Sequence, residues 1–353
     1  MSKFSEKEKG RSYKFFEESI NSKVTLSNYD NWLYTFFKYS GYSDLDKITR
    51  LPTPKLQGLL KNWVTDLKRK LKPNTIRAYL AAVEHFLEMN EVVFHKKIIK
   101  KLIKSDDAIL GGDIPFTTEE IGRMLSSTTK LRTKVLIHFL ASTGARPGAI
   151  IDPVLLKKHL EDMLHGCKAI QIYDESKYRY WAFLTPEASK ALEDYFASRR
   201  LNGETLDDNS PIFKNEESNH RKNDHLSKGS LYQILKNVME VAMIERVKNG
   251  KRYDKAISYG FRKRFNTILK MNNDVNSNIA EKLMAHKRGL DGSYLKPTRD
   301  QCFAEFAKAI PELTIDDSAR KQAHIEKLEA ENSEIDDLKR RVILLESTKP
   351  KKK

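Results

Sequence analysis

The sequence predicts a mainly helical protein with one small β-sheet, an α+β fold built as two domains. Two patterns lead to this prediction. Apolar residues recur at helical spacing through the first hundred residues, and a single stretch, residues 169–185, alternates with the period of a β-hairpin. A length of 353 residues accommodates two or at most three domains, each with a core of its own.

The chain from about Phe15 to Lys104 is predicted to be entirely helical. Three apolar rows each cover one helix face, so the helices are expected to bury these faces against each other in a small bundle, residues 1–104. The rows are Leu26, Tyr29, Leu33 and Phe36; Leu56, Leu59, Leu60, Trp63, Val64 and Leu67; and Ile76, Tyr79, Leu80, Val83, Phe86 and Leu87.

Basic residues gather on the outside of this bundle. A formal net charge of +16 and a pI near 9.5 favour a polyanionic partner, with nucleic acid the leading candidate. A helix start rich in lysine can hold a phosphate through charge and free backbone N–H groups. An ordinary solvated surface is the alternative. The candidate DNA contacts are Lys68, Arg69, Lys70, Lys72, Arg77, Lys97 and Lys101.

Residues 105–115 combine charges, paired glycines and a proline without periodicity, and are predicted to be an interdomain linker. A new helix is expected directly after it, with Thr117 or Thr118 as N-cap and Glu120 at capping-box spacing from Thr117. The second domain is predicted to span residues 116–315. Within it, Leu201–Ser230 is read as a flexible basic loop, where His220 and His225 are expected to be solvated rather than to bind metal.

Two segments of the second domain present arginines. An apolar helix ends at Gly144, and Arg146 follows in the turn, where it can be aimed at a site. Further on, Tyr259 and Arg262 lie one helical turn apart on the same helix face. The predicted hairpin between these segments carries Lys177 at its tip.

The last part of this domain adds a histidine and a tyrosine. A short apolar helix from Ile279 to Met284 delivers His286 at its end, and a segment bounded by Gly289 and Gly292 presents Tyr294. Arginine, histidine and tyrosine side chains that converge suit chemistry on a phosphodiester, which needs positive charge on the oxygens and a nucleophile.

These motifs, in this order, resemble those of the tyrosine recombinase (phage integrase) family. The matching segments are "TGARPGAI", Lys177 after "ES" in the hairpin, "YGFR", "LMAH" and Tyr294 eight residues later. Two positions depart from the usual pattern: Tyr259 replaces the more frequent histidine, and Ala149 replaces an acidic residue. Tyr259 suggests an archaeal or archaeal-virus member of the family.

The resemblance implies a role for each residue. Tyr294 is the expected nucleophile, which forms a 3′-phosphotyrosyl link and frees a 5′-hydroxyl, while Arg146 and Arg262 hold the non-bridging oxygens. His286 is expected to hydrogen-bond an oxygen of the transition state.

The proton to the departing 5′-oxygen is expected from Lys177, with Arg179 and Lys168 as alternatives. Tyr259 is expected to donate a hydrogen bond to the phosphate.

The resemblance also implies the partners and the reaction. Residues 1–104 look like the core-binding domain that precedes the catalytic domain in integrases. The expected partners are double-stranded attachment-site DNA and three further copies in a homotetramer that passes through a Holliday junction, with a DNA-bending accessory protein also possible. The alternatives are a type IB topoisomerase, a DNA-binding protein without catalytic activity, and a metal-dependent nuclease.

No nucleotide or metal motif occurs in the sequence, so neither a cofactor nor a metal is expected. Cys167 and Cys302 lack the spacing of a disulfide framework or a zinc module, which fits a reducing cytoplasm. No stretch is apolar enough to span a membrane, and the charged N-terminus is unlike a signal peptide.

The segment 316–347 is predicted to be a helix of four turns or more. Ile325, Leu328, Asn332, Ile335, Leu338, Val342 and Leu345 are spaced by 3, 4, 3, 3, 4 and 3 residues, a heptad rhythm that slips at Leu338. A two-stranded coiled coil and a helix docked on the catalytic domain both fit this pattern. Residues 348–353 form a basic tail that is expected to be disordered.

Overall fold

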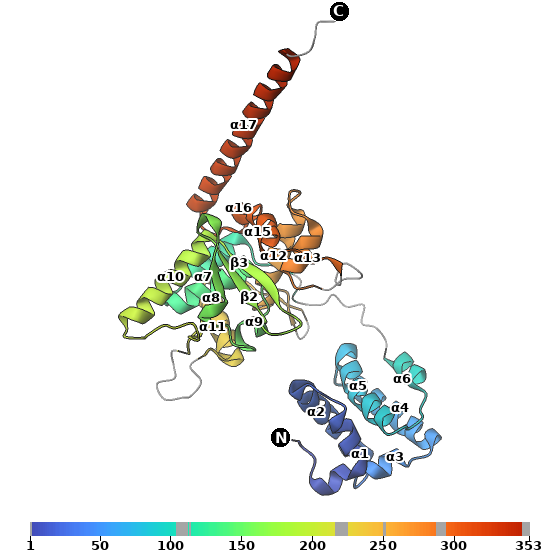
Figure 1. Ribbon diagram of the computed structural model, residues 1–353. Helices are drawn as coiled ribbons and strands as arrows, with labels where there is room; N and C mark the ends of the chain where they lie inside the picture. Colours follow the sequence, from blue (N-terminus) through green and yellow to red (C-terminus); the bar gives the residue numbers. More distant parts are fainter. Residues whose placement is uncertain are drawn as a thin grey trace, which may run out of the picture. The chain divides into compact units, whose positions relative to one another are not determined.

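The computed structural model describes residues 2–103, 112, 114–215, 225–249, 252–286 and 294–347. Two compact units make up the chain, Met1–Ile109 and Leu110–Lys353 (Figure 1). Their boundary falls within the predicted linker 105–115, most of which lies outside the described residues, as does the tail 348–353. The predicted mainly helical α+β fold is confirmed.

The first unit is a bundle of helices around one aromatic core. Phe16, Leu33, Phe36, Trp63 and Phe86 are all fully or almost fully buried in it. The described helices are α1 (Glu6–Glu18), α2 (Lys23–Ser40), α3 (Leu45–Thr49), α4 (Thr53–Lys68), α5 (Pro73–Met89) and α6 (Lys96–Leu102).

Helix α1 begins earlier than the expected start near Phe15. Ser5 and Glu8 form a capping box at its N-terminus. At Gly10, where φ is +62°, the helix kinks, and the Asp46 carboxylate accepts hydrogen bonds from the next two backbone N–H groups. The sequence did not predict the first turns of this helix, because most of its residues are charged and only a few aromatic residues contribute to the core.

The second unit contains the predicted hairpin as part of a three-stranded antiparallel sheet in the order β1-β2-β3. Strand β2 (Lys168–Ile172) pairs with β3 (Tyr180–Leu184), and the short strand β1 (Leu160–Asp162), which the sequence did not predict, pairs with the other edge of β2. Ile170 and Ala182 face the main core, whereas Ala169 and Phe183 face a second cluster with Phe306. Both faces of the sheet are therefore covered.

Helices surround this sheet (Figure 1). Those before and beside it are α7 (Thr118–Ser126), α8 (Leu131–Thr143), α9 (Gly148–Ile151), α10 (Pro186–Leu201) and α11 (Lys228–Val241). Two strands of two residues each, β4 (Lys248–Asn249) and β5 (Arg252–Tyr253), pair with each other. The helices that follow them are α12 (Tyr259–Met271), α13 (Ser277–Leu283), α15 (Arg299–Ala307) and α16 (Ile310–Leu313). The predicted capping box of Thr117 and Glu120 is present at the start of α7.

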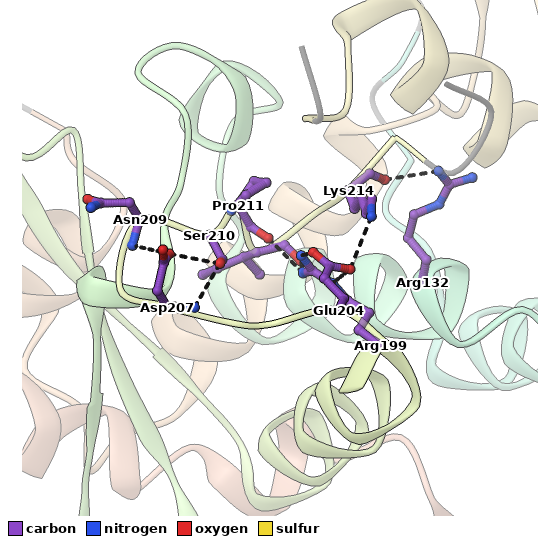
Figure 2. A network of polar contacts seen from close by, with 9 residues as sticks. Arg132, Arg199, Glu204, Asp207, Asn209, Ser210, Pro211 and Lys214 are labelled. Atoms are coloured by element: carbon purple, nitrogen blue, oxygen red, sulfur yellow. Dashed lines mark hydrogen bonds and ion pairs between the residues drawn. The ribbon is translucent and has the colours of Figure 1, made fainter. Parts of the chain in front are cut away.

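The predicted flexible loop Leu201–Ser230 is only partly a free loop. Figure 2 shows that Arg199 at the end of α10 binds the Glu204 carboxylate over 3.0 and 2.5 Å and donates to the Pro211 carbonyl over 2.7 Å. Lys214 binds the same Glu204, and Arg132 of α8 donates to the Lys214 carbonyl. Residues 202–214 are thus fixed by buried and half-buried charges, while 216–224, including His220, lie outside the described residues.

In the described part of the chain, hydrogen bonds fix the segment that leads into the C-terminal helix α17 (Asp317–Ser347). The Glu187 carboxylate accepts from the backbone N–H groups of Ile315 and Asp316 over 2.6 and 3.1 Å, and Arg264 donates to the Glu312 carbonyl over 3.0 Å. Beyond this point the apolar row of α17 is exposed in the described part of the chain. Among the described helices, none combines the length and the apolar character needed to cross a membrane.

Candidate active site

The first arginine of the site is placed by the end of α8. Gly144 caps this helix in the left-handed conformation, with φ of +57°, and a Cβ there would come within 2.6 Å of the Phe265 ring. Glycine is therefore required both by the backbone and by the close packing against α12. Arg146 follows two residues later, half-buried, and its guanidinium makes no hydrogen bond to another described residue.

Arg146 lines a pocket of about 1000 Å³ in which positive charge is concentrated. The pocket is formed by the β2-β3 hairpin, the end of α13 and the segment before α15. None of its described lining residues is acidic. Its polar lining includes Arg146, Gln171, Tyr173, Ser176, Lys177, Arg179, Lys282, His286 and Lys296. Such a pocket suits a phosphate group, since its described lining is rich in basic side chains and contains no acidic one.

Arg262 lies directly behind His286 and joins three segments of the chain. One terminal nitrogen donates to the Gly144 carbonyl over 2.8 Å. The other donates to the Met284 carbonyl over 2.5 Å and to Nε2 of His286 over 2.8 Å. Arg262 is only 6% exposed, and burial together with the charge of Arg146 lowers its pKa from the ordinary value of arginine. The network fixes the turn before Arg146 relative to the end of α13.

Glu281 holds the opposite side of the histidine ring. Its carboxylate lies 2.7 Å from Nδ1 of His286 and 2.7 Å from Nζ of Lys270. Arginine can only donate, so Nε2 must accept and the ring proton must lie on Nδ1, facing Glu281. Burial lowers the pKa of His286, Glu281 opposes this shift, and Arg262 adds to it. A neutral imidazole is consistent with this arrangement.

Two tyrosines complete the inner wall of the pocket. Burial raises the pKa of Tyr173 and of Tyr180, so both phenols stay protonated although Arg146 and Arg262 oppose the shift. Tyr173 has a left-handed backbone with φ of +56°, an unusual conformation for a bulky residue. A Cβ on Gly148 would lie 3.5 Å from the Tyr173 hydroxyl, so this ring packs against the turn that carries Arg146.

Comparisons with known proteins bear on the fold. No protein-family model matches the sequence, and a search of curated proteins found no relative. Among solved structures, the XerH site-specific recombinase bound to difH substrate is 18% identical, with 75% of this chain and 74% of that chain covered and a TM-score of 0.53. The chain has the fold of the tyrosine recombinases.

Two further structures share this fold. The Tn1549 transposon integrase in complex with circular intermediate DNA is 15% identical, with 83% of this chain and 97% of that chain covered and a TM-score of 0.55. A lambda integrase tetramer bound to a Holliday junction is 11% identical, with 82% and 77% covered and a TM-score of 0.52. At these identities the likeness concerns the tyrosine recombinase fold alone.

The three candidate proton donors, Lys177, Arg179 and Lys168, lie at different places along the hairpin, and only the first two line the pocket. Lys177 lies between β2 and β3 and lines the pocket, with its ammonium 5.3 Å from the ring centre of Tyr178. Arg179 lines the pocket as well. Lys168 instead lies at the start of β2 and is held by Asp162 and Glu193 at 2.5 and 2.9 Å. Its ammonium is occupied away from the pocket, which leaves Lys177 and Arg179.

Three predicted site residues do not line the pocket: Arg262, which is buried behind it, and two tyrosines. Tyr294 is 79% exposed, although the next three residues, Leu295–Pro297, form part of the pocket wall. The preceding residues 287–293 lie outside the described residues. Tyr259, the first residue of α12, is 45% exposed and also lies outside the lining. The structure thus brings together Arg146, Lys177, His286 and Arg262, and leaves both tyrosines at the surface.

The structure adds Glu281, Tyr173, Tyr180, Lys282 and Lys296, which sequence reasoning missed. An acidic residue five positions before the histidine was the available signal for Glu281. The tyrosines gave no such signal, since aromatic residues in a hairpin ordinarily pack in a core. Among the described residues, no group of three His, Cys, Asp or Glu side chains is arranged to hold a metal ion.

The candidate DNA contacts of the first unit are all exposed and form two groups. Lys72 caps the start of α5, with Lys68, Arg69, Lys70 and Arg77 around it. The second group, Lys97 and Lys101 on α6, lies near the other end of α5, where Lys96 binds Glu84 and Glu88 at 2.9 and 2.8 Å. Lys72 and Glu84 are separated by twelve residues of helix, about 18 Å along the axis.

Proposed function

We propose that this chain is a site-specific DNA recombinase of the tyrosine type, carried by an archaeal or archaeal-virus mobile element. It cleaves and rejoins DNA through a 3′-phosphotyrosyl intermediate and thereby integrates or excises the element. The observation that carries the proposal is the single basic pocket in which Arg146, Lys177 and His286 meet, with Arg262 bound to His286 at 2.8 Å. The recombinase fold of the chain supports it.

The scissile phosphate would occupy this pocket. Arg146 has its guanidinium available for a non-bridging oxygen, whereas Arg262 already donates to three acceptors. A guanidinium has five N–H groups, so Arg262 retains one hydrogen on a terminal nitrogen and one on Nε for the phosphate. In the described arrangement Nε2 of His286 accepts from Arg262, so the histidine acts on the phosphate through Arg262.

The cleavage step requires a nucleophile and an acid. The Tyr294 oxygen attacks phosphorus and releases its proton to solvent water, the bond to the 5′-oxygen breaks, and Lys177 gives that oxygen a proton. Religation reverses these transfers, and the phosphotyrosyl bond conserves the energy of the broken phosphodiester. The exposed Tyr294 must first approach the pocket, for which the position of Leu295–Pro297 in the pocket wall provides a short connection.

The proposed partners are double-stranded attachment-site DNA and further copies of the chain in a tetramer on two sites. The lambda integrase structure is of a tetramer bound to a Holliday junction, the XerH recombinase is bound to difH substrate, and the Tn1549 integrase is in complex with circular intermediate DNA. A DNA-bending accessory protein is a further proposed partner. The proposed DNA contacts in the first unit lie around the turn between α4 and α5 and on α6: Lys68, Arg69, Lys70, Lys72, Arg77, Lys97 and Lys101.

The test is covalent capture of DNA. The full-length protein is incubated in EDTA with sheared DNA from its own genomic neighbourhood, then denatured, and DNA that stays attached is sequenced. Wild type is expected to give adducts at a defined site, and Tyr294→Phe none. Tyr178→Phe is the matched control, because Tyr178 is also exposed and lines the pocket, yet it is expected to retain the adduct.

The alternatives predict other outcomes. A type IB topoisomerase would give adducts at many sites and would not recombine two copies of one site. Tight DNA binding with no adduct would identify a non-catalytic DNA-binding protein and refute the proposal, and loss of activity in EDTA would indicate a metal-dependent nuclease.

A further inference from the structure

Helix α17 carries a row of apolar side chains that the described parts of the chain leave uncovered. Ile325, Leu328, Ile335, Leu338 and Val342 are between 47% and 58% exposed on a helix of 31 residues. Helices in proteins take most of their stability from packing an apolar face against a neighbour. A long helix with such a row therefore requires a covering surface.

The intervals between successive residues of this row are symmetric about Ile335. Asn332 and Leu338 lie three residues to either side of it, and Leu328 and Val342 lie seven residues to either side. Two identical helices that pair antiparallel are related by a twofold axis, which places positions equidistant from the centre opposite each other. The two consecutive spacings of three that cause the slip at Leu338, Asn332 to Ile335 and Ile335 to Leu338, lie on either side of this centre.

The surface around Ile335 contains a groove that can accommodate an apolar side chain of a partner helix. Ile335, Leu338, Lys339 and Val342 line a shallow groove of about 410 Å³, together with Ile343. The first four are spaced at i, i+3, i+4 and i+7. Four residues of one helix surround each inserted side chain in knobs-into-holes packing. The groove is therefore suited to the apolar row of another helix.

Charged residues beside the row favour antiparallel over parallel pairing of two such helices. Glu329 and Arg341 are both exposed and lie six residues to either side of Ile335. In the sequence, Glu331 and Lys339 lie four residues to either side. Antiparallel pairing centred on Ile335 brings Glu329 opposite Arg341 and Glu331 opposite Lys339, so these two acidic positions each meet a basic one. Parallel pairing in register would instead bring the acidic stretch 329–337 of both copies together.

We propose that α17 is a dimerisation helix that pairs antiparallel with α17 of a second copy of this chain, centred on Ile335. A second copy fits better than an unrelated helix, because the mirrored spacing and the mirrored charges are a property of one sequence paired with itself. This association involves neither the pocket nor DNA, so it is independent of the proposed recombinase function.

The first test is the oligomeric state of the full chain without DNA, measured by sedimentation over a range of concentrations. Wild type is expected to be dimeric at micromolar concentration. Ile335→Asp should weaken the dimer more than about 100-fold, because it buries two unpaired charges at the centre. Ser333→Asp introduces the same charge at an exposed position outside the groove, on the opposite side of the same helix, and should leave the dimer intact. A monomeric wild type, or a dimer insensitive to Ile335→Asp, would overturn the proposal.

The register is tested by exchange of charges and by crosslinking. Arg341→Glu and Glu329→Arg should each weaken the dimer, and the double variant should restore it. Under oxidation, a mixture of Leu328→Cys and Val342→Cys chains should form a disulfide-linked heterodimer, because antiparallel pairing places these two positions opposite each other. The native Cys167 and Cys302 are buried and should not crosslink. Crosslinking of Leu328→Cys to itself, or failure of the double charge variant to recover, would refute antiparallel pairing.

Discussion

Arg262 donates a hydrogen bond to Nε2 of His286 over 2.8 Å, and Nδ1 of the same ring faces the Glu281 carboxylate over 2.7 Å. The arginine and the histidine come from motifs 24 residues apart, and Glu281 belongs to neither. Because the ring proton lies on Nδ1, the bond to Arg262 exists only while the imidazole is neutral. This relationship makes Glu281 a positioning residue of the candidate site and gives the site a pH dependence.

Substitution of Glu281 is expected to slow DNA cleavage by about 10-fold or more while DNA binding is retained, because the carboxylate orients the histidine. Glu281 also raises the pKa of His286. Without it the imidazole stays neutral to lower pH, so in Glu281→Ala the acid limb of the cleavage profile should move to lower pH. The measurement is the rate of adduct formation against pH. Glu305→Ala removes a carboxylate that binds the Asn276 N–H and Lys308 instead, and should leave the acid limb unmoved.

Replacement of either arginine by lysine should reduce cleavage by about 10²- to 10³-fold, since lysine cannot reproduce the fork of a guanidinium. For Arg262→Lys the free energy of unfolding should fall as well, because three buried or half-buried acceptors lose their donor. Arg146→Lys should leave stability nearly unchanged. Arg200→Lys, at an exposed arginine on α10, is the control. Equal loss of stability in both active-site variants would contradict the described network.

Gly144→Ala should destabilise the chain by more than its backbone strain alone. Left-handed backbone costs a non-glycine residue about 1–2 kcal/mol, and the clash with Phe265 adds about 1–3 kcal/mol. Gly41→Ala is a matched control, since Gly41 also caps a helix with positive φ but has no neighbour within 4 Å of an added Cβ. Urea unfolding measures both. A similar loss in the two variants would show that Phe265 can move aside.

Stability should decrease as the pH falls from about 6.5 toward 4, in part through His138. Burial lowers the pKa of His138 to about 4, so the folded state resists the proton that the unfolded chain accepts from about pH 6.5 downward. The contribution of neutral His138 to the free energy of unfolding is fully present above pH 6.5. It decreases by about 2–3 kcal/mol as the pH approaches 4. In His138→Gln the free energy of unfolding should depend less on pH in this window. His165→Gln, at an exposed histidine, should show the wild-type slope.

If Lys97 and Lys101 contact phosphates, each change to glutamine should weaken DNA binding similarly for all sequences. The slope of log affinity against log salt should fall by about 1 for each lysine. The control is Lys9→Gln, because Lys9 lies on α1 and binds Glu6 at 2.7 Å. Gel shifts at several salt concentrations measure the slopes. Unchanged slopes would assign α6 to the solvated surface.

The sequence by itself determined the features that depend on residues close together in the chain. Helical rows, the hairpin alternation and the Thr117–Glu120 capping box all recur in the structure, because periodicity and capping act over a few residues. The end of α8 at Gly144, just before Arg146, was predictable for the same reason. The exceptions, α1 and β1, have weak local patterns and depend on distant partners such as Asp46 and β2.

Tertiary structure alone decided which side chains of the candidate site meet. The bond from Arg262 to the Gly144 carbonyl joins residues 118 positions apart, and no local pattern specifies it. The same holds for Tyr173 and Tyr180 in the pocket wall, for Lys168 held away from the pocket by Glu193, and for Tyr294 at the surface. Side-chain composition fixed the chemistry available to this chain. Long-range packing fixed the arrangement, because burial and hydrogen-bond partners depend on segments that meet only when the chain is folded.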